Sequence, residues 1–273
     1  MSRTVPQRGA CSRRNGNLTL GEVTEAVRPV RMTEQSIATY DVSQRVKTYD
    51  ADMELMHPNR SKMVQVAIEV LPFPRTAALR AIDLGIGTGY FTKQFLSHFP
   101  NSQVLGIDGA QAMVELAKAR LRSLASRVQF VIGDFRKLQE LAPGAGTADV
   151  VFSAYALHHL SRPDKEKVLR AVVELLVPGG WFINADLTVA DSPGLESRLQ
   201  ELRVAGIVER AGGSDNRFTD SASTRRFLAD LQKNERDQPL TLAEDLALLR
   251  SSGLKHVSAF WLEYRELVSG GQK

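Results

Sequence analysis

From residue 79 onward, short apolar runs alternate along the chain with longer segments in which apolar residues recur at steps of three and four. Short apolar runs are typical of strands buried on both faces, and the longer segments are typical of amphipathic helices. Because strand and helix alternate, the pattern predicts a parallel sheet that helices cover on both faces. The predicted strands are residues 79–84, 102–108, 127–133, 148–155 and 181–187.

The predicted helices carry regular apolar stripes. Phe91, Phe95 and Phe99 recur at four-residue steps after the first strand, so one face of that helix is expected to be buried. The helix after the fourth strand begins with a Ser-x-x-Asp signal at Ser161. Residues 178–180, Pro-Gly-Gly, are expected to stop this helix before the fifth strand.

The alternation lapses after residue 187, where two helical segments follow. The first is expected to bury a stripe made of Leu195, Leu199, Leu202 and Ala205. Further on, residues 256–264 alternate again like a closing strand. The predicted organisation is a disordered basic tail (1–21), an N-terminal helical cap (22–78), a central core (79–187), a helical lid insertion (188–240) and the end of the core, with a helix and terminal strands (241–273).

The charge of the chain is unevenly placed. Its 273 residues include 35 Lys and Arg against 31 Asp and Glu, a net charge of +4, and this excess equals the four arginines of residues 1–21, which contain no acid. The neutral remainder lacks the net attraction to phosphate that drives non-specific nucleic-acid binding, so a nucleic-acid partner is not expected. We expect the tail to be a plain extension, with an organelle transit peptide as the alternative.

Two further absences narrow the class of protein. No run of about eighteen apolar residues occurs, so no membrane-spanning helix is expected. The single cysteine, Cys11, permits neither an internal disulfide nor a cysteine-based zinc site, and no spacing of histidines suggests a metal. The sequence therefore predicts a cytoplasmic protein without a metal.

The end of the first predicted strand carries three glycines at alternate positions, Gly85, Gly87 and Gly89, before a helix. Glycine lacks the Cβ that would collide with a ligand, and it can adopt positive φ, so this turn makes room at the carboxyl end of the strand. A dinucleotide-binding turn would need a glycine where Tyr90 stands, and no Gly-Lys-Ser/Thr follows, as a phosphate-binding loop would require. The turn thus favours a ligand other than a dinucleotide or a nucleoside triphosphate.

Three acids occupy matching positions on successive strands. Asp83 lies near the end of the first strand, Asp108 ends the second, and Asp134 follows the third. Because the carboxyl ends of parallel strands meet at one edge of a sheet, these carboxylates are expected to surround one crevice.

At these residues the chain resembles the class I S-adenosylmethionine-dependent methyltransferases, over residues 79–187. The resemblance implies a doubly wound, mostly parallel seven-stranded sheet, a Rossmann-like methyltransferase fold, in which a last strand runs antiparallel. It also implies that the glycine turn passes under the methionine part of S-adenosylmethionine, that Asp108 binds both ribose hydroxyls, and that Asp134 faces the adenine amino group. The matching stretches are 83–89, 106–108, 133–135 and 176–180.

The residue types agree with those roles. A carboxylate can accept hydrogen bonds from both hydroxyls of a diol and from an exocyclic amine. Met113 and Phe135 would supply apolar contacts to the adenine, although ordinary core packing is the alternative for both. The cofactor-binding residues predicted in this way are Asp83, Gly85, Gly87, Gly89, Asp108, Met113, Asp134, Phe135 and Ser153.

The fourth predicted strand leads into His158 and His159, which could take a proton from the methyl acceptor. Asp186, near the end of the fifth strand, is an alternative base. Tyr40 and Tyr49 are candidates to cover the cofactor. Methyl transfer depends mostly on orientation and exclusion of water, so the choice of base stays open here.

The sequence therefore predicts a methyltransferase that uses S-adenosylmethionine and acts on a small-molecule acceptor. The alternatives are an RNA methyltransferase, a carboxylated-cofactor synthase and a catalytically silent binding protein with the same fold. The acceptor and the oligomeric state stay open at this point.

Overall fold

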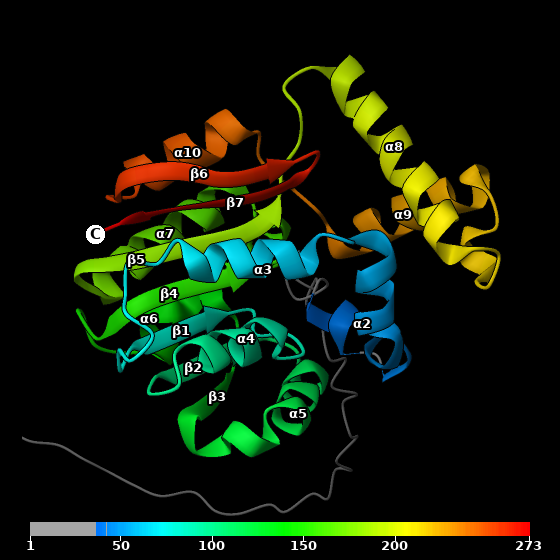
Figure 1. Ribbon diagram of the computed structural model, residues 1–273. Coiled ribbons are helices and arrows are strands. Elements are labelled where there is room, and N and C mark those ends of the chain that lie inside the picture. Colours follow the sequence, from blue (N-terminus) through cyan, green and yellow to red (C-terminus); the bar gives the residue numbers. More distant parts are fainter. Residues whose placement is uncertain (1–36, 42) are drawn as a thin grey trace, which may run out of the picture. The chain divides into compact units, whose positions relative to one another are not determined.

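The computed structural model describes residues 37–41 and 43–273, which build a seven-stranded sheet between two layers of helices (Figure 1). The strand order is β3-β2-β1-β4-β5-β7-β6; the strands from β3 to β5 are parallel, and β7 is antiparallel to both β5 and β6. The predicted fold class is confirmed. The strands are β1 (Arg80–Leu84), β2 (Gln103–Asp108), β3 (Val128–Ile132), β4 (Ala148–Ala154), β5 (Leu176–Leu187), β6 (Lys255–Glu263) and β7 (Glu266–Gln272).

The direction of strand addition reverses at β1, which lies between β2 and β4. In the register of the sheet, Asp83 of β1 stands opposite Gly106 of β2 and Phe152 of β4. A reversal of this kind opens a crevice outside the carboxyl ends of the two flanking strands. The strand order alone thus locates the place where a ligand can bind.

The helices divide between the two faces of the sheet. Helices α3, α4 and α5 lie on the near face in Figure 1 and pack on one core cluster, whereas α6, α7 and α10 pack on the other. The helices are α2 (Ser43–Met56), α3 (Arg60–Glu69), α4 (Tyr90–His98), α5 (Gln111–Arg120), α6 (Leu138–Leu141), α7 (Arg162–Leu175), α8 (Pro193–Ala211), α9 (Ser221–Glu235) and α10 (Leu242–Ser251), with short 3-10 turns η1 (Arg122–Arg127), η2 (Phe135–Lys137), η3 (Leu157–His159) and η4 (Asn216–Phe218).

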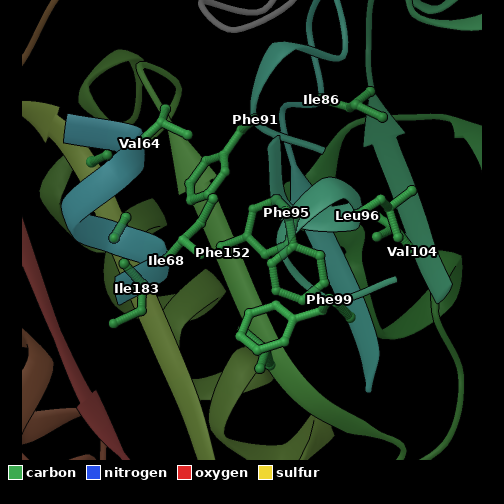
Figure 2. Close-up of a cluster of buried hydrophobic side chains, with 14 of the residues drawn as sticks. Val64, Ile68, Ile86, Phe91, Phe95, Leu96, Phe99, Val104, Phe152 and Ile183 are labelled. Carbon is green, nitrogen blue, oxygen red and sulfur yellow. The ribbon is translucent and has the colours of Figure 1, made fainter. Parts of the chain in front are cut away.

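The predicted phenylalanine stripe is confirmed. Phe91 and Phe95 of α4 and Phe99, the first residue after this helix, are buried, and Phe91 and Phe95 pack against Phe152 of β4 (Figure 2). The ring centroids of Phe91 and Phe152 are 4.3 Å apart, and those of Phe95 and Phe152 are 4.9 Å apart. Aromatic rings at these separations bury large apolar surfaces and fix α4 on the sheet behind the glycine turn.

Residues 188–240, called the insertion below, leave the sheet and return to it at one point. The Thr188 hydroxyl donates to the Leu240 carbonyl oxygen over 2.8 Å, and the Val189 amide donates to the same oxygen over 3.1 Å. Helices α8 and α9 of the insertion pack with α2 beyond the carboxyl ends of the parallel strands (Figure 1). Their shared cluster consists of Met56, Val204, Ile207, Ala211, Phe218 and Leu228.

The buried stripe predicted for the first helix of the insertion is wrong. Leu195 is 52% exposed and Ala205 is exposed, whereas Val204 and Ile207 are buried. The residues of α8 that enter the cluster shared with α9 and α2 are Val204, Ile207 and Ala211, whereas Leu199 and Leu202 are half-buried at the wall of a cavity.

The end of α7 and the end of the sheet also differ from the prediction. Residues 178–180 do not form a turn between helix and strand, because α7 already ends at Leu175 and β5 includes them from its start at Leu176. Residues 256–264 form β6, but the strand that runs antiparallel to the parallel set is β7. The tail at 1–21 and the beginning of the helical cap lie outside the described residues. None of the helices within 37–41 and 43–273 is both long enough and apolar enough to span a membrane.

Candidate functional site

A cavity opens at the carboxyl ends of β1, β2 and β4, at the reversal point of the sheet. Three of its walls come from strand ends, and a fourth comes from the helical residues ahead of the sheet, including Tyr40, Tyr49 and Arg60. It is called the first cavity below. Of the predicted site residues, those that line it are Asp83, Gly85, Gly87, Asp108, Met113, Asp134, Phe135 and His159.

The glycine turn is shaped by positive φ angles of 74° at Gly85, 53° at Gly87 and 75° at Gly89. A Cβ built on Gly85 would lie 2.5 Å from the Cβ of Ala156, so the turn could not pack against η3 with any other residue. A Cβ on Gly87 would meet only the Gly85 carbonyl oxygen, at 3.8 Å, and would otherwise enter open space at the cavity wall. Glycine at position 87 therefore leaves room for a ligand to approach the main chain.

Asp108 fixes the turn from the neighbouring strand. Its Oδ2 atom accepts a hydrogen bond from the Gly87 amide over 2.8 Å, and its Oδ1 atom accepts one from the Ala110 amide over 2.9 Å. Burial raises the pKa of Asp108, and these two amides counteract that effect. Each carboxylate oxygen keeps a further lone-pair site, so the group can still accept hydrogen bonds from a ligand in the cavity.

Asp83 lies deeper in the wall of the first cavity and is almost fully buried. The Thr92 hydroxyl donates to its Oδ2 atom over 2.6 Å. Burial raises the pKa of Asp83 to about 7, although this hydrogen bond acts in the opposite direction, and the nearby negative charge of Asp108 raises the pKa further. Asp83 is therefore a carboxyl group that titrates near neutral pH beside a ligand cavity.

Asp134 begins the short turn η2. Its Oδ1 atom accepts a hydrogen bond from the Arg136 amide over 2.9 Å, and its Oδ2 atom forms an ion pair with the Arg136 side chain. Phe135 and the buried Met113 stand at the same wall. The three residues give this end of the cavity one charged group beside an apolar surface, which suits a flat, partly polar ring.

Four predicted site residues do not line the first cavity, although all but Asp186 lie close along the chain to residues that do. Gly89 faces α5, where a Cβ would lie 2.9 Å from Leu121. The buried Ser153 hydroxyl donates to the Leu84 carbonyl oxygen over 2.8 Å and so ties β4 to β1. The other two are His158 and Asp186, which contact each other.

The His158 and Asp186 side chains form a buried ion pair between η3 and the end of β5. Asp186 Oδ1 lies 2.5 Å from His158 Nδ1, and Asp186 Oδ2 accepts a hydrogen bond from the His158 amide over 3.0 Å. Although burial alone would lower it, the Asp186 carboxylate raises the pKa of His158. A buried and mutually satisfied pair of this kind holds η3 against the sheet.

His159 is the histidine that borders the first cavity. Its Nε2 atom lies 3.2 Å from the Tyr40 hydroxyl, and its Nδ1 atom lies 3.1 Å from Oδ1 of Asp237, near the end of the insertion. Although burial opposes it, His159 and His158 hold the pKa of Asp237 below its usual value. The two atoms do not meet at the angle of a normal hydrogen bond, so the carboxylate acts through its charge, which favours a proton on Nδ1 and leaves Nε2 free to accept one on the cavity side.

The same corner brings together a donor set that could hold a metal. Nε2 of His158 lies 3.6 Å from Oδ1 of Asp237, and one ligand atom from each of His158, His159 and Asp237 lies within 4.8 Å of the other two. Two imidazoles and a carboxylate are ligands that zinc takes. The sequence contained no such signal, because Asp237 is far from the histidines along the chain.

A cluster of buried polar residues that sequence reasoning missed lies behind the cavity wall. Tyr155, with a φ of 49°, lines the first cavity and donates a hydrogen bond to Glu266 Oε1 over 2.8 Å. His57 Nδ1 lies 3.0 Å from the same oxygen. Burial lowers the pKa of His57 to about 4. Nothing in the local sequence marks these residues, because they come from three distant segments.

Arg60, at the start of α3, is another residue of the first cavity that the sequence did not single out. Its guanidinium lies 4.1 Å from the centroid of the Tyr90 ring, and its Nη1 atom donates to Asp50 Oδ1 over 2.9 Å. The cavity thus carries a cation opposite the acids of the strand ends.

Comparison with known proteins agrees with this geometry. The sequence profile of a family described as a methyltransferase domain matches residues 81–180, which include the glycine turn, Asp108 and Asp134.

Two curated relatives carry the same kind of domain. The chain is 31% identical over 137 residues to an uncharacterised methyltransferase of Geobacillus kaustophilus, which covers 50% of this chain and 60% of the relative. It is 37% identical over 107 residues to the trans-aconitate 2-methyltransferase of Deinococcus radiodurans, which covers 39% of this chain and 37% of that protein. The chain therefore spans less than two thirds of the length of these relatives.

A solved structure with the same fold is that of an O-methyltransferase family protein from Burkholderia thailandensis. It superimposes with a TM-score of 0.61 at 18% sequence identity, over 86% of this chain and 62% of that protein.

Proposed function

Because the chain belongs to the class I S-adenosylmethionine-dependent methyltransferase family, we propose that it transfers a methyl group from S-adenosylmethionine to a small-molecule acceptor. The observation that carries this proposal is the first cavity, in which an open glycine turn and three carboxylates from successive strand ends stand together. The insertion and the residues ahead of the sheet border the side on which an acceptor would enter.

The residues of the first cavity fit this cofactor. Open space at the Cβ position of Gly87 leaves room for the methionine part to lie against the turn. Asp108 would accept the ribose hydroxyls, and Asp134 would accept the adenine amino group beside Met113 and Phe135.

The charges of the cavity suit the methionine end of the cofactor. Arg60 would bind its carboxylate, as a guanidinium does in other carboxylate sites, and the ionised Asp83 would stabilise the nearby positive charge. When bound, S-adenosylmethionine supplies a methyl carbon that is already electrophilic because it is attached to a sulfonium.

The residues beside that carbon would do three things. They would orient the acceptor, exclude water and remove its proton. We assign the removal of the acceptor's proton to Nε2 of His159. Asp237 would orient the ring from the side of Nδ1, and the Tyr40 hydroxyl would cover Nε2 until the acceptor binds. His158 and Asp186, the other bases that the sequence suggested, would keep η3 in place.

Calorimetry and a labelled-transfer assay together test the proposal. We expect saturable binding of S-adenosylmethionine, and absence of binding at millimolar cofactor would reject it. The protein is then incubated with cofactor labelled in the methyl group and, separately, with a small-molecule extract, with trans-aconitate as a first defined acid, and with total RNA. Label in a small molecule is expected; label in RNA alone would favour an RNA methyltransferase, and binding without any transfer would favour a silent binding protein.

A further inference from the structure

A second cavity lies on the far side of Tyr155, between the α2–α3 junction, α8 of the insertion and the turn that joins β6 to β7. It is separate from the first cavity, and three arginines from two distant segments line it. Its charged lining residues are Arg203, Arg210, Glu263, Arg265 and Glu266.

Arg203 is half-buried, and it has no partner in the described part of the chain. Its guanidinium makes no hydrogen bond or ion pair of normal length with any residue of the described part of the chain, and its Nη1 atom is buried. Burial, together with the nearby charge of Arg265, lowers the pKa of Arg203 to about 10. A buried and unpaired cation is costly unless something pairs with it.

The carboxylates around Arg203 are already engaged. Glu266 accepts the Tyr155 hydroxyl over 2.8 Å and faces His57 at 3.0 Å. Glu196 Oε1 lies 2.9 Å from Nε of Arg265. The Nη1 atom of Arg265 is itself buried, and it too forms no hydrogen bond among residues 37–41 and 43–273. Two guanidinium groups therefore present unsatisfied donors to the same region.

The two cavities share a wall. Tyr155 lines the first cavity, its ring centroid lies 4.8 Å from that of His57, and both His57 and Glu266 line the second. A molecule in the second cavity would thus lie directly behind the corner where the first cavity ends.

We propose that the second cavity binds the anionic group of the methyl acceptor, a carboxylate or a phosphate monoester, through Arg203 and Arg265. This inference rests on the proposed function, since it names the chemical class of the acceptor. A planar guanidinium can donate two parallel hydrogen bonds to an oxyanion, and two such groups side by side suit an acceptor with several oxyanion oxygens. The oxyanion supplies the pairing that Arg203 lacks in the protein alone.

This proposal makes a prediction opposite in sign to that of a structural arginine. Replacing a structural, paired arginine destabilises the protein because the partner is left unpaired. Replacing Arg203 by Met removes an unpaired buried charge and keeps the apolar stem, so the ligand-free protein should melt at the same or a higher temperature.

The test is thermal melting of the full chain at constant ionic strength, in chloride, inorganic phosphate or citrate. Citrate probes the carboxylate class and phosphate the phosphate class. We expect one of the two to raise the melting temperature of the parent protein by about 2–4 °C or more, and to leave Arg203→Met unchanged. The matched control is Arg198→Met on the same helix, since Arg198 is exposed and pairs with Glu201 at the surface; it should respond like the parent.

The proposal is overturned if neither anion stabilises the parent protein, if Arg203→Met responds as the parent does, or if Arg203→Met melts several degrees lower in chloride. Calorimetry with S-adenosylmethionine on the same variants separates this inference from the proposed function. Arg203→Met should keep the cofactor affinity of the parent within twofold. Absence of anion binding by the parent protein, with intact cofactor binding, refutes only the inference, whereas failure of the parent to bind cofactor refutes the proposed function.

Discussion

The two cavities of this protein are built in different ways. The floor of the first consists of main chain and acids at the ends of neighbouring parallel strands, which come from consecutive units of one repeating pattern, and residues ahead of the sheet cover it. The second consists of side chains from the α2–α3 junction, the insertion and the β6–β7 turn, which are far apart along the chain.

This difference suggests that the first cavity is constrained by the fold, whereas the side chains of the second cavity are free to vary. The geometry of the first cavity follows from the sheet itself, because the strand order fixes where the carboxyl ends meet. The second cavity depends on which side chains the insertion happens to carry, so its chemistry can vary while the sheet stays the same. We therefore expect substitutions in the first cavity to change cofactor binding, and substitutions at or beyond the shared wall to change turnover or acceptor choice.

The largest effect is expected at His159, which borders the first cavity. His159→Gln should lower kcat by about 10²–10⁴-fold, the usual contribution of a general base, with cofactor affinity within twofold of the parent. Asp237→Asn should lower kcat by about tenfold and shift its pH profile, because it acts through His159. His98→Gln on α4 is the control. Turnover that survives in His159→Gln would remove this residue from the mechanism.

The next largest effect concerns the glycine turn. Gly87→Val should weaken cofactor binding by about 100-fold or more, since the new side chain enters the cavity and the backbone has positive φ. Gly213→Val is the control for strain, because Gly213 also has positive φ with nothing near its Cβ position, but it lies at the end of α8. Equal cofactor affinity in both variants, measured by calorimetry, would show that the turn does not contact the cofactor.

A smaller loss is expected at the second strand end. Asp108→Asn should weaken cofactor binding by about 30-fold, or ~2 kcal/mol, because charge-assisted hydrogen bonds are lost. Asp149→Asn, which breaks an exposed ion pair with Arg80, should leave the cofactor affinity unchanged. If both variants bind the cofactor alike, Asp108 serves only to hold the turn amides.

The smallest effect is a dependence on pH. Because the pKa of Asp83 is raised to about 7, cofactor affinity should fall about tenfold between pH 8 and pH 6 as the carboxylate becomes protonated. The folding contribution has the opposite trend: it is fully present below pH 3.8 and is lost as pH rises through about 7, since the native state holds the proton more tightly. Asp83→Asn should abolish the pH dependence of binding; a dependence that persists would assign it to another group.

Much of the sheet could be predicted because its parallel strands are short apolar runs between amphipathic helical segments, and such runs are typical of buried strands. Strand β7 was harder, since its sequence is Glu-Leu-Val-Ser-Gly-Gly-Gln and yet six of its seven residues are buried. Its glycines are needed because a Cβ on Gly270 would lie 2.3 Å from the Phe182 carbonyl oxygen. An interior strand of this kind packs by close backbone approach, which leaves no apolar pattern.

The residues of the candidate site likewise fall into those that a local sequence pattern marks and those that it does not. The sequence singled out Gly85, Gly87 and the three acids because each carries a local signal at a strand end, and the structure brings them to one cavity. It gave no sign of Asp237 or Arg203, whose positions depend on how the insertion folds back over the sheet. Contacts between distant segments follow from tertiary packing, which no short pattern in one segment encodes.

The root of the insertion has a consequence for engineering. The chain leaves the sheet after Thr188 and returns at Leu240, and both ends are held at a single carbonyl oxygen. The segment between them can therefore be exchanged for that of a related enzyme with the same attachment point. We expect such a chimera to take the acceptor preference of the donor enzyme and to keep the cofactor binding of the host.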